Sequence, residues 1–345
     1  MSATTTVAAS AAAASASASA SAYLESLDPS TYNVYGYTPV KSANLVGLIL
    51  FDIAWAAHIS LGIYYRQIWF GVCMFIACGL ETAGYIARFL SNSNPDNVHN
   101  FLLQIICLTL APAFFMAGIY FLLAEIVIIW GVKNSIAKPW AYSQLFILLD
   151  IISIILQAAG GGLAATALLD NEETDTGTHI MVAGLAFQVF STSLFFIAGF
   201  IFWVKSHKSR QRAKQFADTL YVPTIEPDMT IGEQNYASPE YIGPEKFAHI
   251  RNSKWTKFEI AAIIIAVVLV YIRSIYRVVE LSMGWTGYLM AHEVFFLVLD
   301  GLMVVIAMWI MFIFYPGIFF GQIKISTEHK ALLEAPSDQA IEIKF

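Results

Sequence analysis

Charged residues are scarce in this sequence. Only 13% of its 345 residues are Asp, Glu, Lys or Arg, whereas 58% are hydrophobic; a soluble domain is usually about one quarter charged. The mean hydropathy is +0.64. No basic domain is present that would suit a nucleic acid, and the net charge of −6 resides largely in loops and tails. The composition therefore indicates a membrane protein and predicts no nucleic-acid partner.

The sequence also lacks the motifs of several functional classes. It has no Gly-rich nucleotide loop of the Walker type, no histidine pair at zinc spacing, and no lysine in its last apolar segment for a retinal Schiff base. The three cysteines, Cys73, Cys78 and Cys107, lie inside apolar segments, so a disulfide between exterior loops is not expected. Buried acids can perform acid–base chemistry, but no nucleophile is identifiable. We therefore expect no enzymatic activity, no metal and no cofactor.

What the sequence does contain is a series of long apolar segments. A helix needs about 20 apolar residues to cross the hydrocarbon core of a membrane. Seven segments satisfy this requirement, at about 44–64, 68–90, 101–130, 142–167, 179–204, 257–279 and 292–315. The predicted fold is an all-α, polytopic membrane protein with seven transmembrane helices in a membrane domain spanning residues 44–315.

The flanking segments are expected to be tails. Residues 1–22 are almost entirely Ala, Ser and Thr and do not resemble a signal peptide, so the first span is expected to direct insertion. We predict a disordered N-terminal tail over residues 1–43 and a C-terminal tail over residues 316–345.

The distribution of Lys and Arg predicts the orientation. Cytoplasmic loops carry an excess of these residues. With the N-terminus outside, fifteen of them fall on inner segments and four on outer segments or outer helix ends. Residues 170–178 hold four acids and no base, as an exterior loop can. The N-terminus is therefore predicted outside, with the C-terminus and the loop 205–256 in the cytosol.

The loop 205–256 begins with five bases in "KSHKSRQRAK", residues 205–214. Such a run suits the anionic inner leaflet of the membrane, although a simple topology anchor is the more economical interpretation. The remainder of the loop, with four prolines and scattered acids, is predicted to be flexible.

Polar side chains within the apolar segments are candidates for a lipid-binding site. Ionisable residues at membrane depth cost free energy and usually face the protein interior. In the predicted orientation most of them lie in the outer half of the bundle. The candidates are Glu81, Arg88, Asp150, Gln157, Gln188, Arg273, Arg277, Glu280, Glu293 and Asp300, with Asp52 and Gln104 expected nearby. Acids outnumber bases among them, so the cluster would suit a cationic or polar headgroup, or a proton relay.

Seven-residue spacing places two side chains on one face of a helix. The pairs Glu81–Arg88, Asp150–Gln157 and Glu293–Asp300 have this spacing, and we predict that the last two pairs point into the bundle. In "YIRSIYRVVELS", residues 271–282, the side chains of Arg273, Arg277 and Glu280 form a stripe. We predict that Arg273 pairs with Glu81, Glu293 or Asp300 across the bundle and that Arg277 lies nearer water.

Structural interpretations exist for each of these residues. Arg88, Arg277 and Glu280 could extend to water at the interface, and Glu81–Arg88 could be a purely structural pair. The cluster as a whole favours function, because packing alone does not explain so many buried charges.

Three further features lie within the spans. Glu125 is predicted to be structural or part of an inner gate. Pro112 is predicted to kink the third helix or to open its backbone bonding. "GGG" at residues 160–162 is typical of tight helix packing or of a helix end, with local unwinding as the alternative.

Six stretches carry a resemblance to a known family. They are "ETAGYIAR" (81–88), "ICLTLAPAFFMAGIY" (106–120), "DIISIILQAAGGG" (150–162), "GLAFQ" (184–188), "RSIYRVVE" (273–280) and "HEVFFLVLD" (292–300). In this order they resemble the fungal lipid-translocating exporters associated with resistance to aminocholesterol and to sphingoid long-chain bases. One departure is "YPG" at residues 315–317, where relatives often have His-Pro-Gly.

The resemblance implies a plasma-membrane protein that translocates or exports amphipathic lipids. Sphingoid long-chain bases, related cationic amphiphiles and sterol-like toxins are the implied substrates, with lipid or drug tolerance as the result. Membrane lipids, including the anionic inner leaflet at residues 205–214, are the expected partners, and the oligomeric state is not predicted. A seven-helix sensor or regulator of lipid asymmetry, without transport of its own, is the alternative.

Overall fold

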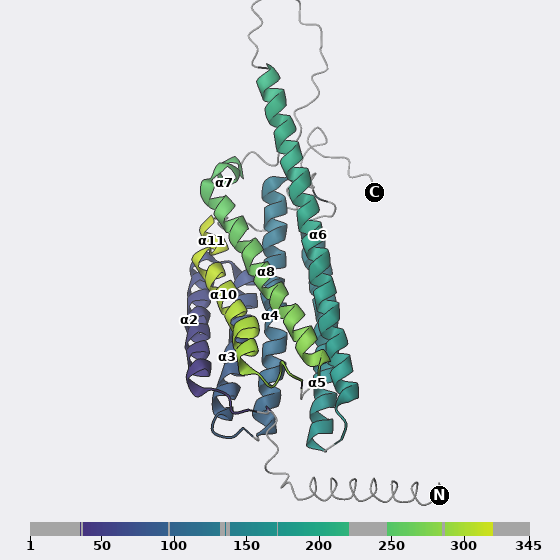
Figure 1. Ribbon diagram of the computed structural model, residues 1–345. Helices are drawn as coiled ribbons and strands as arrows, with labels where there is room; N and C mark the ends of the chain where they lie inside the picture. Colours follow the sequence, from purple (N-terminus) through teal and green to yellow (C-terminus); the bar gives the residue numbers. More distant parts are fainter. Residues whose placement is uncertain are drawn as a thin grey trace, which may run out of the picture.

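The fold is a bundle of long helices (Figure 1). The computed structural model describes residues 35, 37–95, 97–131, 135, 139–170, 172–220, 247–284 and 287–319. Within these residues every regular element is helical, and seven helices are long and apolar enough to cross a membrane. The prediction of an all-α, seven-span membrane protein is confirmed.

The first six spans are single helices, and the seventh is composite. The elements are α2 (Lys41–Tyr65), α3 (Ile68–Ser91), α4 (Val98–Trp130), α5 (Pro139–Leu169), α6 (Asp175–Leu220), a short α7 (Ala248–Asn252), α8 (Lys254–Ser282), then α9 (Glu293–Phe295), the π-helical η4 (Phe296–Leu302) and α10 (Met303–Ile313), followed by α11 (Pro316–Phe319). Spans in a hydrocarbon environment are helical because each backbone N–H and C=O group has to form its hydrogen bond within its own segment.

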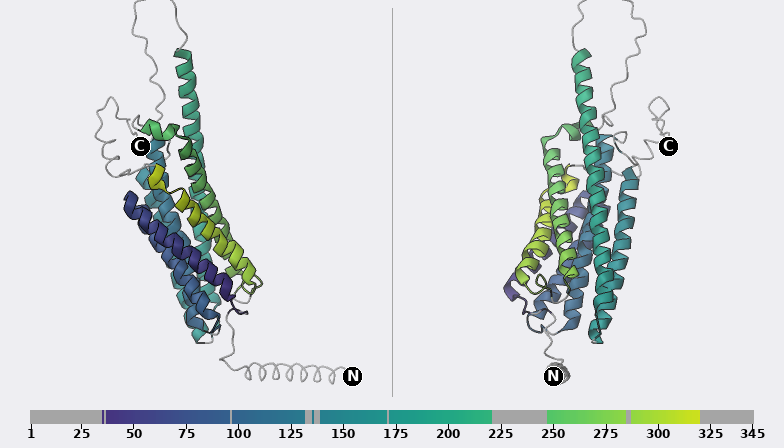
Figure 2. Two further views of the ribbon diagram at one scale, coloured as in Figure 1. Left: turned by 90° about the vertical axis from the view of Figure 1, so that its left-hand side faces the viewer. Right: turned by 45° about the vertical axis from the view of Figure 1, so that its right-hand side comes forward.

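Helix α4 lies at the centre of the bundle. In its most apolar window 83% of the residues are buried, against 17% in α2. Helix α3 packs on one side of α4 and α5 on another, with α8 also in contact. Figure 2 shows α2 beside α10 on one side of the molecule and α5 beside α6 on the other. The central helix continues through Pro112 without a break in its helical assignment.

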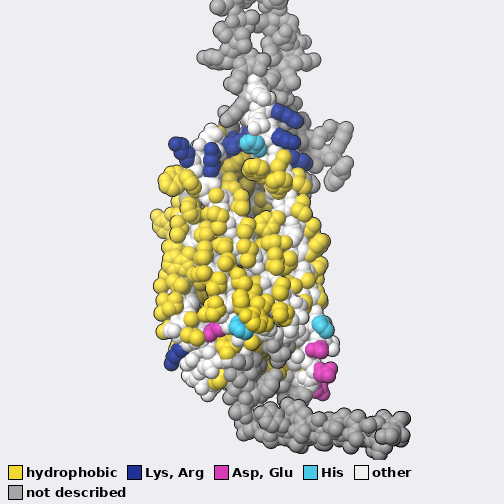
Figure 3. All heavy atoms as spheres, in the orientation of Figure 1, with side chains coloured by type: hydrophobic (Ala, Val, Ile, Leu, Met, Phe, Trp, Pro, Cys, Tyr) yellow, Lys and Arg dark blue, Asp and Glu magenta, His cyan; other side chains and the backbone are white. Residues whose placement is uncertain are grey.

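The charged side chains are separated between the two ends of the bundle (Figure 3). At the end where α6 terminates they are mostly bases, and we call this the basic end. Lys205 and Lys208 belong to the last part of α6, and Lys254 is the first residue of α8. The opposite end carries the acids of the α5–α6 connection, Glu172 and Glu173, and we call it the acidic end. Exposed apolar side chains cover the surface between the two ends.

The two boundaries of the predicted loop 205–256 differ from the structure. Helix α6 continues to Leu220, so the basic run 205–214 is helical and not part of a loop. Its Lys, Arg, Gln and Ala residues have high helix propensity, and no Gly or Pro interrupts the run before Pro223. The predicted flexible stretch falls largely on residues 221–246, which lie outside the described residues. At the other boundary α8 begins at Lys254.

The glycine-rich stretch of α5 packs closely against α6. A Cβ atom at Gly160 would overlap the backbone of Met181, and one at Gly177 would overlap the backbone of Ala164. The two helices therefore approach each other backbone to backbone at these positions, as small residues allow in membrane proteins. By contrast, a Cβ atom at Gly162 would meet no atom within 4 Å. The prediction of tight helix packing at "GGG" is confirmed for its first glycine.

The close contact predicts different outcomes for neighbouring glycines. We expect Gly160→Ala to destabilise the protein by about 1–3 kcal/mol, because the methyl group has to push two backbones apart. Gly162→Ala should be neutral or slightly stabilising, because alanine is the better helix former. Thermal unfolding of the detergent-solubilised variants measures the difference. Equal unfolding temperatures for the two variants would contradict a close backbone contact at Gly160.

Candidate functional site

Arg273 connects three helices near the acidic half of the bundle. Its Nε atom lies 2.8 Å from Oδ1 of Asp300 in η4, and both side chains are almost fully buried. The contact is an ion pair and not an aligned hydrogen bond. Its Nη2 atom donates a hydrogen bond to the carbonyl oxygen of Leu108 in α4. The prediction that Arg273 pairs across the bundle is confirmed, with Asp300 as the partner.

The hydrogen bond to Leu108 is explained by a proline. In a helix the carbonyl oxygen of residue 108 accepts from the N–H of residue 112, and Pro112 has no N–H. The carbonyl of Leu108 therefore lacks its helical donor, and Arg273 supplies a donor from α8. Pro112 was predicted to kink the third helix or to open its backbone bonding. The second alternative is confirmed, because Arg273 donates to the carbonyl oxygen that Pro112 leaves without a helical donor.

Arg277 lies one turn further along α8 and is completely buried. Its Nη1 atom is 2.5 Å from Oε2 of Glu280, and its Nη2 donates to Oγ1 of Thr109 at 3.2 Å. Tyr276 donates to the other carboxylate oxygen of Glu280 at 2.7 Å. The prediction that Arg277 lies nearer water is wrong, because α8 extends to Ser282 and both charges are enclosed by protein.

Glu81 from α3 completes this group, which we call the arginine core: Glu81, Arg273, Arg277, Glu280 and Asp300. Glu81 is 1% exposed and interacts electrostatically with both arginines and with Asp300. Within the described residues its Oε1 atom has no hydrogen-bond partner. Three acids face two bases in this core, so it carries one net negative charge when all five groups are ionised.

The backbone around Asp300 has an unusual conformation. Asp300 and Gly301 belong to the π-helical turn η4, a conformation found frequently at functional sites. A Cβ atom at Gly301 would collide with the hydroxyl group of Tyr85 from α3. The glycine thus lets Tyr85 approach the backbone beside the ion pair.

A second ion pair closes the acidic end. The Nη2 atom of Arg88 lies 3.0 Å from Oε1 of Glu293 and donates a hydrogen bond to the hydroxyl group of Tyr37 at 2.6 Å. Glu293 also accepts from the backbone N–H of Val40 and from Nδ2 of Asn44. The guanidinium of Arg88 therefore pairs with α9 and not with Glu81 on its own helix.

The segment before α2 takes part in this closure. Tyr35 is 3% exposed, and its hydroxyl oxygen lies 2.8 Å from Oε1 of Gln104 and 2.9 Å from Oγ of Ser91. Burial raises the pKa of Tyr35 to about 12, so its hydroxyl stays protonated at neutral pH. Residues 35 and 37–40, which we call the N-terminal strap, fall within the predicted tail 1–43. Their role was not predicted from the sequence, although the tyrosines of "YNVYGY", residues 32–37, are a signal for it.

The other three candidates form a separate group between α4, α5 and α6. Asp150 accepts from the hydroxyl group of Tyr120 at 2.9 Å. Gln157 donates to Oε1 of Gln188 at 3.0 Å and to Oγ of Ser153 at 2.6 Å. These side chains face the bundle interior, as the seven-residue spacing predicts, but they lie on the α5–α6 side of α4. The structure therefore places the ten candidates in three groups and not in one cluster: the arginine core, the Arg88–Glu293 pair and this third group.

Further acids lie outside these three groups. Asp52 was expected near the cluster, but it is exposed on α2 and accepts from Thr82, because the buried face of α2 is formed by Phe51, Ala54 and His58. Glu125 is buried in the basic half of α4 and interacts electrostatically with buried Glu259 of α8. Glu259 was not among the candidates, although "KFEIA" places an acid inside an apolar run.

The ion pair between Arg273 and Asp300 predicts a strong effect on stability. Asp300→Ala leaves Arg273 buried without its charge partner, which typically costs about 3–5 kcal/mol. We expect a large loss of folded protein, and the swapped variant Arg273→Asp with Asp300→Arg should recover part of it. The measurement is the yield of monodisperse protein after solubilisation.

Lys41→Ala is the matched control, because it removes an exposed charge at the same end of the bundle. An Asp300→Ala variant with the yield of Lys41→Ala would contradict a structural role for the ion pair.

Comparisons with known proteins place these residues in a family. The family described as RTA1 like protein matches residues 74–323, which include the whole arginine core. The chain is 35% identical over 289 residues to the sphingoid long-chain base transporter RSB1 of Saccharomyces cerevisiae, covering 83% of this chain and 74% of that protein.

Two more distant relatives from the same organism match over a similar length. The chain is 27% identical to Protein RTM1 over 333 residues, which covers 85% of this chain and 94% of that protein. It is also 27% identical to Protoporphyrin uptake protein 1 over 336 residues, with 86% and 96% covered. No solved structure matches the chain. The family match and the similarity to RSB1 together show that this chain belongs to the RTA1-like family.

Proposed function

We propose that this protein moves sphingoid long-chain bases and related amino-bearing amphiphiles across the fungal plasma membrane. The expected direction is toward the outer face, and the expected result is tolerance to toxic lipids and drugs. The name of the yeast relative supports this substrate class, since the match covers 83% of the chain. Family membership supports lipid export in general.

The observation that carries the proposal is the acid excess of the arginine core. Glu81 is buried, and its Oε1 has no hydrogen-bond partner within the described residues. Buried polar atoms are normally bonded, so this oxygen is available to a donor that the resting protein does not supply. An ammonium group offers three N–H donors and one positive charge. It would satisfy the oxygen and neutralise the core.

The closure of the acidic end sets a condition on this mechanism. The ion pair between Arg88 and Glu293 and the N-terminal strap lie on the acidic-end side of the arginine core. A headgroup leaving the core toward that end therefore has to separate these contacts. In this proposal the strap and the Arg88–Glu293 pair form the outer gate, and the sphingoid chain stays in apolar surroundings while the headgroup passes.

The proposal includes the orientation predicted from the sequence. The basic end would face the cytosol and the acidic end the exterior, in agreement with the positive-inside rule. We expect a cysteine at Lys208, in a variant without the three native cysteines, to resist a membrane-impermeant maleimide in intact cells. A cysteine at Glu173 should react. Both positions are exposed. If the cysteine at position 208 reacts and the cysteine at position 173 is protected, the orientation is the opposite of the proposed one.

Glu81→Gln tests the headgroup site. The amide keeps the size of the side chain but removes its negative charge, so we expect nearly normal protein yield and a strong loss of transport. Purified protein in liposomes carrying a fluorescent sphingoid base gives the rate of movement between leaflets. Glu172→Gln is the control, since it removes an exposed acid in the α5–α6 connection.

Two results would overturn the proposal. Wild-type protein that binds the labelled base without moving it would instead support a sensor. A Glu81→Gln variant that transports at the wild-type rate would remove the arginine core from substrate recognition. Tolerance to added sphingoid base in a fungal host provides the cellular counterpart of both measurements.

A further inference from the structure

A long groove lies between α4, α6 and α8 in the basic half of the bundle, away from the arginine core. Its volume is about 430 Å³, and most of its lining is apolar, with Phe195, Phe200 and Trp203 contributed by α6. Phe200 and Trp203 are 64% and 57% exposed. The groove is therefore open sideways, toward the lipid.

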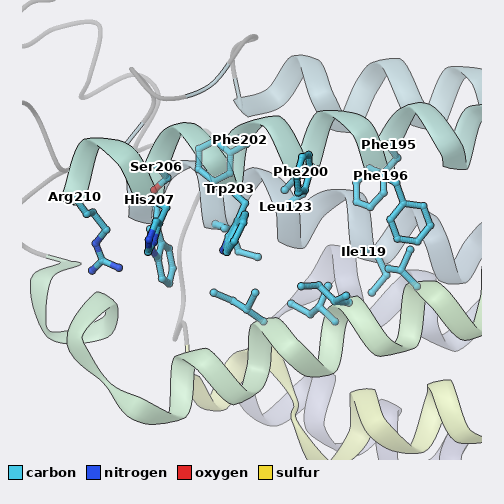
Figure 4. Close-up of a pocket in the computed structure, with 17 residues that line it drawn as sticks. Ile119, Leu123, Phe195, Phe196, Phe200, Phe202, Trp203, Ser206, His207 and Arg210 are labelled. Carbon is cyan, nitrogen blue, oxygen red and sulfur yellow. The ribbon is translucent and has the colours of Figure 1, made fainter. Parts of the chain in front are cut away.

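The two ends of the groove differ in chemistry. Figure 4 shows Arg210, Ser206 and His207 at one end, and Ile119, Phe195 and Phe196 at the other. The polar end coincides with the basic run 205–214, at the level where the bundle surface changes from apolar to charged. No acidic side chain lines the groove within the described residues.

The polar end contains donors whose hydrogen-bonding capacity is largely unused among the described residues. Ser206 is 5% exposed, and its Oγ atom has no hydrogen-bond partner within the described residues. The guanidinium of Arg210 carries five N–H donors. In the described part of the chain it makes one long hydrogen bond, 3.4 Å, to the carbonyl oxygen of Arg251 and lies over the ring of Trp130. An acceptor with several oxygens would match this end.

The length of the groove corresponds to one leaflet. Phe195 and Arg210 are fifteen residues apart on α6, which is about 22 Å of helix. The hydrocarbon half of a bilayer is about 15 Å thick, and the remaining length reaches the headgroup level. A chain lying along the groove would therefore extend from the headgroups to the middle of the membrane.

We propose that the groove binds an anionic phospholipid of the adjoining leaflet. One acyl chain lies along Phe195, Phe200 and Trp203, and the phosphate accepts hydrogen bonds from Arg210 and Ser206. A sphingoid base is a poor occupant, because its ammonium group would meet the cationic Arg210 with no acid beside it. The site is thus distinct from the proposed substrate site. Only the identity of the leaflet rests on the proposed orientation.

A retention experiment tests the proposal without any transport measurement. The purified protein is equilibrated in nanodiscs of phosphatidylcholine with a minor fraction of phosphatidylserine, and native mass spectrometry measures the lipid retained after mild delipidation. We expect selective retention of phosphatidylserine. Arg210→Gln removes a charge-assisted hydrogen bond and should lower its retention about tenfold. Ser206→Ala should have a smaller effect in the same direction.

Two further variants separate the groove from general surface charge. Lys208→Gln removes an exposed charge from the same basic run without touching the groove, so its retention should equal that of the wild type. Gly199→Leu fills the groove, and its Cβ atom would meet no atom within 4 Å. We expect it to fold normally and to lose phosphatidylserine.

Three outcomes would overturn the proposal. The first is equal retention of phosphatidylcholine and phosphatidylserine by the wild type. The second is a loss in Lys208→Gln as large as that in Arg210→Gln, which would indicate general electrostatic attraction. The third is displacement of the bound phosphatidylserine from the wild-type protein by sphingosine, which would make the groove a substrate path. A failure of transport in liposomes leaves each of these readouts unchanged.

Discussion

The carbonyl oxygen of Leu108 has no helical donor, because Pro112 stands four residues further along α4. The arrangement of the helices around α4 depends on how Arg273 supplies the missing hydrogen bond. An unpaired carbonyl group and an unpaired guanidinium group are each costly in a membrane. Here the hydrogen bond between them provides the carbonyl with a donor and the guanidinium with an acceptor. Asp300 balances the remaining charge, so α4, α8 and η4 are held in one register. Arg277, donating to Thr109 one residue after Leu108, ties α8 to the same turn of α4.

The two sides of α4 are held by different kinds of interaction. On the α3, α8 and η4 side, ion pairs connect charged groups that would be costly to bury without a partner. On the α5–α6 side, the polar contacts within the α5–α6 pair are amide and hydroxyl hydrogen bonds, supported by the backbone contact at Gly160. Neutral hydrogen bonds contribute less than charge-assisted ones. The groove lies at the boundary between these two sides, where α6 meets α8. A gap is more easily tolerated at this boundary than inside the ion-paired half.

Local patterns in the sequence predicted the spans and the inward faces, because both follow from hydropathy and helical period. These local patterns did not predict which charged side chains pair with each other. Arg88 shares a face with Glu81, yet it pairs with Glu293, since the rotation of α3 against α9 decides which acid is within reach. The burial of Arg277 was also missed, because depth along a helix does not reveal what covers it. The separation of Asp150 and Gln157 from the arginine core depends on the central position of α4, which no single segment encodes. The groove likewise exists only in the packing of three helices.

The charge of the arginine core constrains how a cationic lipid could use it. Each arginine already has an acid beside it, so an incoming ammonium group does not need to displace a base. Glu81 has electrostatic attraction to both arginines but retains an oxygen without a hydrogen bond among the described residues. In the proposed mechanism, binding at that oxygen would remove the net negative charge that the core carries when all five groups are ionised, and release would restore it. The proposed substrate binding would therefore leave the helix contacts intact. A core with equal numbers of acids and bases would bind the same headgroup only by breaking one of the ion pairs that hold α8 and η4 in place.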